Sequence, residues 1–159
     1  MLVIVSHERR RVVYFNVTSS PSAQWTAQQV VQAFPFDTAP RFLIRDHDSI
    51  YGTFLPKRIG DLGIEEVLTA YRSPWQNPYC ERWIGTARRD CLDHVIVWNK
   101  AQVRRTLHEF LSYYHADRTH QGLANDCPES RPVEPRSVGR VVELPRVGGL
   151  HHRYTRLAA

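Results

Sequence analysis

The sequence RFLIRDHD, residues 41–48, decides the fold prediction. Residues 41–45 are a short, mainly apolar run that predicts a buried β-strand, and this run continues directly into Asp46. Catalytic groups of α/β sheets commonly lie at such strand ends. If the strand continues, Asp48 points the same way as Asp46 and is a competing candidate.

Strand and helix patterns alternate around this stretch. The first two strands are expected to form a hairpin, and Ser22 offers an N-cap for the helix that follows it. Gly63 is expected to end the second helix. The element order indicates a mixed α/β domain. The expected elements are strands over residues 2–5, 11–17 and 65–69, and helices over residues 22–34 and 53–62.

Two long helices are predicted next, one from Asn77 or Tyr79 to about Val97 and one over residues 101–115. On the first helix, the expected core-facing stripe is Ile84, Ala87, Cys91 and Val95. We expect three parts of the chain. They are a mixed α/β core over residues 1–125, a proline-rich linker over 126–138, and a β-hairpin tail over 139–159.

Composition narrows the possible partners. The net charge is +5, and only two of the 21 basic residues are lysines. Arginine forks suit contacts with phosphate, so the basic balance permits nucleic-acid binding but does not by itself indicate it. The apolar runs are too short for a membrane span, and no signal peptide is visible. We therefore expect a cytoplasmic protein with no membrane partner.

Two carboxylates stand out as candidates for chemistry. Asp46 ends a strand, and Glu81 follows 35 positions later in the first turn of a helix. Either residue alone is typical of a turn or of a helix N-terminus. Together they suit Mg²⁺, which binds carboxylate oxygens that converge from separate elements.

Five stretches resemble bacterial DDE transposases with an integrase core. The resemblance covers roughly residues 2–135 and implies a ribonuclease-H-like mixed sheet flanked by helices. It also implies DNA strand cleavage and transfer with Mg²⁺ or Mn²⁺, and Asp46 and Glu81 as catalytic metal ligands. It favours Asp46 over Asp48. The matching stretches are residues 44–52, 72–82, 88–94, 113–115 and 118–123.

Several side chains near Glu81 are candidates for DNA contact. Arg88 lies on the same side of the helix as Glu81, two turns later, where it could reach a phosphate. Polar and aromatic residues precede Glu81 in a loop that can stack on bases. His47 is expected to support the site or face DNA. The remaining candidates are Arg82, Arg89, Trp75, Gln76 and Asn77.

The first aspartate of the family's site has no counterpart here, since no Asp precedes Asp37. In the family this residue lies on the central strand, so we expect that strand to be missing as well. The resemblance thus implies that residues 1–125 are an integrase-like catalytic core that is incomplete at its N-terminus. The consequences would be weak metal binding, impaired catalysis and unpaired strand edges that favour a homo-oligomer. The alternatives are a non-catalytic DNA-binding remnant of a mobile element and a plain ribonuclease H.

Overall fold

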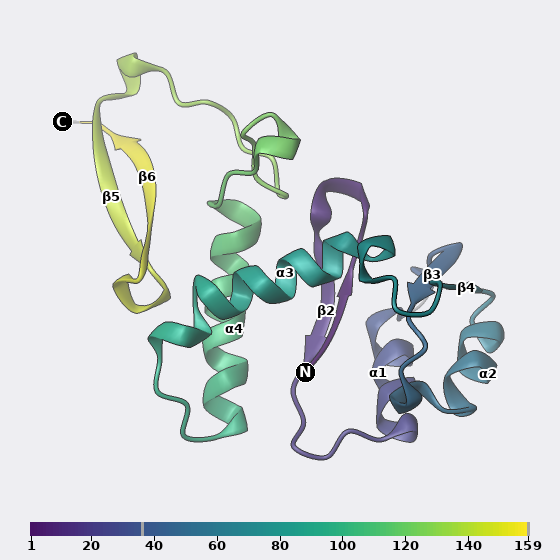
Figure 1. The fold of residues 1–159 in the computed structure, drawn as a ribbon. Coiled ribbons are helices and arrows are strands. Elements are labelled where there is room, and N and C mark those ends of the chain that lie inside the picture. The colour runs from purple at the N-terminus through teal and green to yellow at the C-terminus, as the bar shows by residue number, and fades with distance from the viewer. Residues whose placement is uncertain (36, 159) are drawn as a thin grey trace. The chain divides into compact units, whose positions relative to one another are not determined.

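The computed structural model describes residues 1–35 and 37–158 and has a mixed α/β fold (Figure 1). The chain divides into two compact units. Unit 1 contains Met1–Val5 and Val12–Ile84, and unit 2 contains Ser6–Arg11 and the chain from Gly85 onward. Within the described residues, no helix has the length and apolar character needed to cross a membrane.

The predicted N-terminal hairpin is confirmed. β1, Leu2–Val5, pairs antiparallel with β2, Val12–Asn16. The helix α1 follows at Ala23–Ala33, and the side chain of Ser22 accepts a hydrogen bond from the backbone N–H of Trp25. Ser22 is therefore the N-cap that the sequence predicted.

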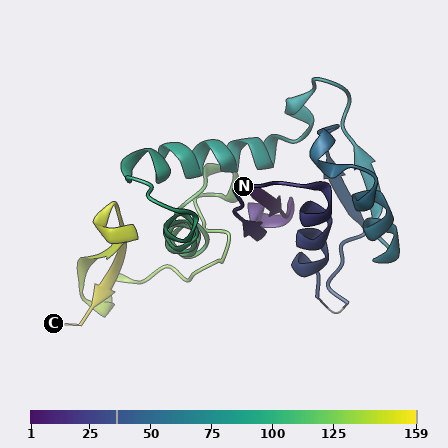
Figure 2. The same ribbon diagram turned by 90° about the horizontal axis from the view of Figure 1, so that it is seen from below.

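α1 packs against the hairpin and against α2, Phe54–Asp61 (Figures 1 and 2). Gln29 of α1 is buried, and its Oε1 accepts hydrogen bonds from the Tyr14 hydroxyl at 2.8 Å and from Asn16 Nδ2 at 2.6 Å. These bonds satisfy a buried amide and fix α1 against β2. The apolar core around α1 and α2 consists of Ile4, Ala27, Val30, Ala33, Phe34, Leu55, Ile59 and Ile64.

β3, Phe42–Arg45, and β4, Glu65–Leu68, form a parallel pair whose connection contains α2. A helical crossover of this kind is what parallel strands require. In the described residues the strands form three separate two-stranded sheets, so the β1–β2 and β3–β4 pairs are not hydrogen-bonded to each other.

α3, Pro78–Arg89, is shorter than predicted, because a 3₁₀ turn at Leu92–His94 follows it. The helix does not reach Val97. Residues 95–97 are all β-branched and have low helix propensity. A new helix, α4, then begins at its own N-cap and covers Lys100–Ala116.

The predicted core stripe of α3 is only partly correct. Ala87 and Cys91 are fully buried, as expected, but Ile84 is 40% exposed. Trp83, which lay outside the predicted stripe, is 1% exposed. The buried face is therefore rotated toward Trp83.

In unit 2, α4 contacts β5, Arg140–Arg146, which pairs with β6, His151–Leu157 (Figure 2). The turn between these strands lies at Val147–Gly149, within the predicted C-terminal hairpin. Asp117 follows α4, and its carboxylate is 2% exposed. This carboxylate lies within 4.0 Å of three guanidinium groups, those of Arg131, Arg146 and Arg153.

Candidate metal and nucleic-acid site

Asp46 directly follows β3, and its side chain is exposed. The backbone N–H of Asp48 donates to Oδ1 of Asp46 at 3.3 Å. The side chain of Asp48 accepts a hydrogen bond from the N–H of Ile50 at 2.9 Å and so caps the 3₁₀ turn at Ser49–Tyr51. Asp48 therefore has a local structural role, and Asp46 in turn accepts a hydrogen bond from the Tyr51 hydroxyl.

Two neighbours of Asp46 were not identified from the sequence. Burial and the negative charges of Asp46 and Asp48 raise the pKa of the Tyr51 hydroxyl. Arg45 donates from Nη1 to the backbone oxygen of Asp46 at 2.8 Å and from Nε to Glu66 at 2.5 Å. The signal that could have revealed Arg45 is its charge within an otherwise apolar strand.

Glu81 lies in the first turn of α3, which begins at Pro78. Proline suits this first position because its φ angle is already helical, and the positive end of the helix dipole favours a carboxylate there. Cys80 precedes Glu81, and burial raises the pKa of its thiol. The charges of Glu81 and Asp46 raise this pKa further. Both carboxylates therefore lie within electrostatic range of Cys80.

The loop between β4 and α3 is tied to the residue after Asp46. The ring of His47 stacks on that of Tyr71, and His47 Nε2 lies 2.7 Å from the carbonyl oxygen of Thr69. Farther along, Gln76 Oε1 accepts a hydrogen bond from the N–H of Ala70 at 2.6 Å. The loop is therefore held by a hydrogen bond within it, and its contacts with His47 fix its start to the segment after β3.

Trp75 is 70% exposed in this loop, so it is not the buried anchor of a self-packed loop. The side chain of Asn77 is hydrogen-bonded to the Cys80 thiol, next to Glu81. Gln76 and Asn77 are therefore engaged in hydrogen bonds with Ala70 and Cys80. Trp75 instead presents an aromatic surface to solvent.

The predicted DNA-contacting arginines fall in both units. Arg82 is exposed in unit 1, and Arg88 and Arg89 are exposed in unit 2. Arg88 Nε lies 3.5 Å from Asp93 Oδ1, and both side chains are more than half exposed. An exposed pair of this kind is weak, so it leaves Arg88 able to exchange its partner for a phosphate.

The described residues contain no group of three or more His, Cys, Asp or Glu side chains that could hold a metal ion. Asp46 and Glu81 supply hard oxygen donors from two elements of unit 1. Mg²⁺ typically uses one or two carboxylates and completes its shell with water and substrate phosphates. The two residues therefore fit a cation that depends on substrate for part of its coordination.

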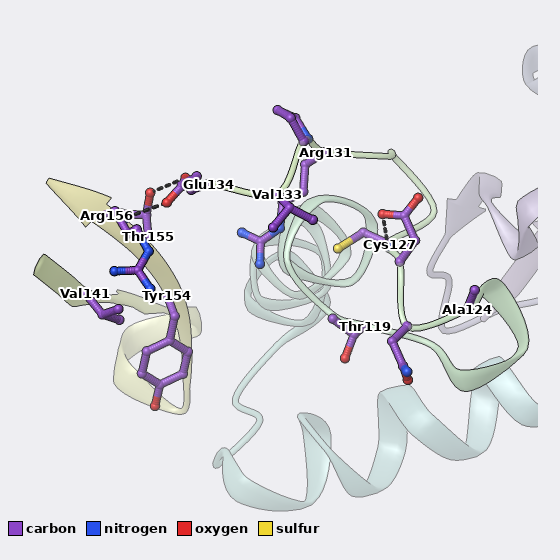
Figure 3. Close-up of a pocket in the computed structure, with 13 residues that line it drawn as sticks. Thr119, Ala124, Cys127, Arg131, Val133, Glu134, Val141, Tyr154, Thr155 and Arg156 are labelled. Atoms are coloured by element: carbon purple, nitrogen blue, oxygen red, sulfur yellow. Dashed lines mark hydrogen bonds between the residues drawn. The ribbon is translucent and has the colours of Figure 1, made fainter. Parts of the chain in front are cut away.

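A separate cavity of about 520 Å³ lies in unit 2 (Figure 3). One wall is the segment after α4, and the other is the β5–β6 hairpin. Beside this cavity, Glu134 accepts hydrogen bonds from the Thr155 hydroxyl and from the backbone N–H of Arg156, which join the segment after α4 to the hairpin. None of the predicted site residues lines it, so it belongs to the packing of the hairpin rather than to the candidate site.

Part of the chain is similar to a known protein family. Residues 62–128 match the sequence model of a family described as the integrase core domain. The matched region contains β4, the loop with Trp75, the whole of α3 with Glu81, and α4. Asp46 lies before it. No curated protein matches the chain.

Proposed function

We propose, from the match of residues 62–128 to the integrase core domain, that this chain acts in DNA integration and transposition. The reaction would be metal-dependent DNA strand cleavage and transfer. The observation that carries this proposal is the placement of two exposed carboxylates, Asp46 and Glu81, at the ends of separate elements of one unit. Both influence the same thiol, that of Cys80.

Asp46 and Glu81 would hold Mg²⁺ or Mn²⁺ in this function. When bound, such ions stabilise the attacking and leaving oxygens of phosphodiester chemistry. The protein's own contribution is to orient the two carboxylates and to position DNA beside them. Since two carboxylates bind Mg²⁺ more weakly than three, we expect weak metal binding and impaired catalysis in this chain.

DNA would contact the basic and aromatic side chains near Glu81. Exposed Trp75 offers a face on which a base can stack, and Arg82, Arg88 and Arg89 offer charge for phosphates. Gln76 and Asn77 would contribute through the loop that they stabilise. A net charge of +5 supports an anionic partner.

A ribonuclease-H-like arrangement is part of this proposal. In that arrangement a further strand would lie between the β1–β2 hairpin and the β3–β4 pair. The two pairs are separate in the described residues, which is compatible with that arrangement lacking its central strand. Strand edges left without partners favour association, so a homo-oligomer is part of the same expectation.

A second candidate function is DNA binding without catalysis. The observation that favours it is the lack of a third acidic or other ligating side chain at the site among the described residues. In this case Arg82, Arg88 and Arg89 would bind DNA. Substitution of Asp46 or Glu81 would not change the affinity for DNA.

A DNA cleavage and strand-transfer assay with Mg²⁺ or Mn²⁺ separates these functions. We expect metal-dependent DNA binding and at most weak strand transfer, both reduced in Asp46→Asn and Glu81→Gln. Asp61→Asn is the matched control, because Asp61 is an exposed carboxylate on α2 of the same unit.

Full strand-transfer activity that Glu81→Gln abolishes would show that catalysis is not impaired. DNA binding that is equally strong with and without metal, and that neither Asp46→Asn nor Glu81→Gln changes, would favour the non-catalytic function. Cleavage confined to the RNA strand of a hybrid would indicate a ribonuclease H instead.

A further inference from the structure

Arg45 is the last residue of β3, and its side chain is only 12% exposed. Its Nε donates to Oε1 of Glu66 on β4 at a distance of 2.5 Å, and the Glu66 side chain is 22% exposed. In the parallel register Arg45 is opposite Leu68, so Glu66 lies diagonally across the strand pair. The ion pair therefore ties the end of β3 to β4.

The same guanidinium group makes two further contacts. Nη1 of Arg45 donates to the backbone oxygen of Asp46 at 2.8 Å. The guanidinium carbon lies 4.8 Å from the centroid of the Tyr51 ring, a distance typical of a cation–π contact. One side chain thus connects β4, the backbone of Asp46 and the 3₁₀ turn that follows.

These contacts bear on Asp46 because they hold its backbone carbonyl and also the Tyr51 ring, whose hydroxyl is hydrogen-bonded to the Asp46 carboxylate. Asp46 lies past the end of the strand, and its side chain is exposed. Its carboxylate accepts a long hydrogen bond, of 3.3 Å, from the N–H of Asp48 and another from the Tyr51 hydroxyl. Fixing its backbone carbonyl limits the directions in which its carboxylate can point. Groups behind a metal ligand commonly set its orientation in this way.

Arginine suits this role for a geometric reason. Its planar fork can donate from Nε and Nη1 at the same time, in two fixed directions. A lysine ammonium could keep the positive charge and the pairing with Glu66, but it could not also reach the Asp46 carbonyl in the same geometry.

We propose that Arg45, held by Glu66, is a positioning residue that orients Asp46 as a ligand for a divalent cation. This inference rests on the proposed function, since it assumes that Asp46 binds the cation. It adds residues outside the stretch that matches the integrase core domain, which begins at residue 62.

The test is Mn²⁺ binding to the full chain, measured from the EPR signal of free Mn²⁺, together with urea unfolding of the metal-free protein. We expect Arg45→Lys to weaken Mn²⁺ binding by about 10-fold, while the urea midpoint stays close to that of the wild type. Glu66→Gln should weaken binding in the same direction. Arg58→Lys is the control, because Arg58 is 60% exposed and pairs with Asp61 on α2.

The outcomes distinguish this inference from the proposed function. If Asp46→Asn abolishes Mn²⁺ binding but Arg45→Lys and Glu66→Gln bind as the wild type does, the positioning role is wrong and the proposed function stands. If the wild type does not bind Mn²⁺, or Asp46→Asn has no effect, both are overturned. Should Arg45→Lys fail to fold, Glu66→Gln decides the matter.

Discussion

The imidazole ring of His47 stacks on the phenol ring of Tyr71, with centroids 3.9 Å apart and planes inclined by 12°. His47 Nε2 also lies 2.7 Å from the carbonyl oxygen of Thr69. These contacts join the residue after Asp46 to the start of the loop that leads to Glu81. A contact between side chains that are 24 positions apart therefore links the segments that carry the two candidate ligands.

Replacing His47 should loosen this loop. In His47→Ala both the stacking and the hydrogen bond are lost, and we expect the backbone N–H of Ala70 to exchange about 5-fold faster, as the loss of about 1 kcal/mol implies. That N–H donates to Gln76 within the loop, so it reports on loop opening. Hydrogen exchange followed by NMR provides the measurement.

Two variants make this prediction specific. His47→Phe keeps an aromatic ring but not the bond to Thr69, so its exchange rate should lie between those of the wild type and His47→Ala. Tyr71→Phe keeps the stacked ring and should exchange as the wild type does. Equal exchange in all four proteins would show that the stack does not order the loop.

The local elements were predictable because they follow from local rules. Ser22 is an N-cap because its side chain can accept a nearby N–H. The run of residues 41–45 forms β3, which ends directly before Asp46, as the apolar pattern indicated. The end of α3 was not predicted, because its helical pattern of apolar residues hid the poor helix propensity of residues 95–97.

The surroundings of the site could not be read from the sequence. Asp46 and Glu81 were identified from their motifs, but the ion pair of Arg45 with Glu66 joins residues 21 positions apart. Which of several acidic residues pairs with Arg45 depends on the register of β3 and β4. Sequence patterns give strands, but they do not give this register.

Asp117 in unit 2 should be a major determinant of stability. Its carboxylate is 2% exposed and balances three arginines that are each about one third exposed. In Asp117→Ala the three positive charges lose their counter-ion, and we expect the free energy of unfolding to fall by about 3 kcal/mol. Urea denaturation followed by circular dichroism measures this change.

Asp93→Ala is the matched control for Asp117→Ala. Asp93 also pairs with an arginine in unit 2, but its side chain is 52% exposed. Exposed pairs contribute little, so this variant should lose less than about 1 kcal/mol. Similar losses in the two variants would contradict a special role for the buried carboxylate.

Acid should destabilise the protein through His120. Burial, followed by the charges of Arg118 and Arg10, lowers the pKa of His120 from 6.5 to about 4. Between these pH values the unfolded chain binds a proton that the folded chain does not. The contribution of His120 to the free energy of unfolding is therefore fully present above pH 6.5. It is lost as the pH drops toward 4, with a slope of up to about 1.4 kcal/mol per pH unit.

Urea denaturation between pH 7.5 and 4 tests this dependence. His120→Gln cannot titrate, so its stability should fall less steeply in this range. Part of the slope should remain, because burial also lowers the pKa of His115. His94→Gln is the control, since His94 is exposed, and it should keep the full slope. A full slope in His120→Gln would rule out this histidine as the cause.

Two glycines of unit 1 should respond in opposite directions to the same substitution. Gly52 ends the 3₁₀ turn that carries Tyr51, with φ of 50° and ψ of −156°, a conformation that essentially only glycine adopts. A Cβ there would lie 2.7 Å from the Cβ of Ala23. Gly60 lies within α2, and a Cβ there would meet nothing within 4 Å.

Gly52→Ala should therefore lower the free energy of unfolding by about 2 kcal/mol, because it combines backbone strain with a steric clash. Gly60→Ala should raise it by about 0.5–1 kcal/mol, because alanine has less conformational freedom to lose in a helix. Urea unfolding of both variants and the wild type under the same conditions measures these two changes. A loss of stability in Gly60→Ala as well would mean that the space beside Gly60 on α2 is not open. A neutral effect at Gly52 would mean that the turn after Asp46 can rearrange.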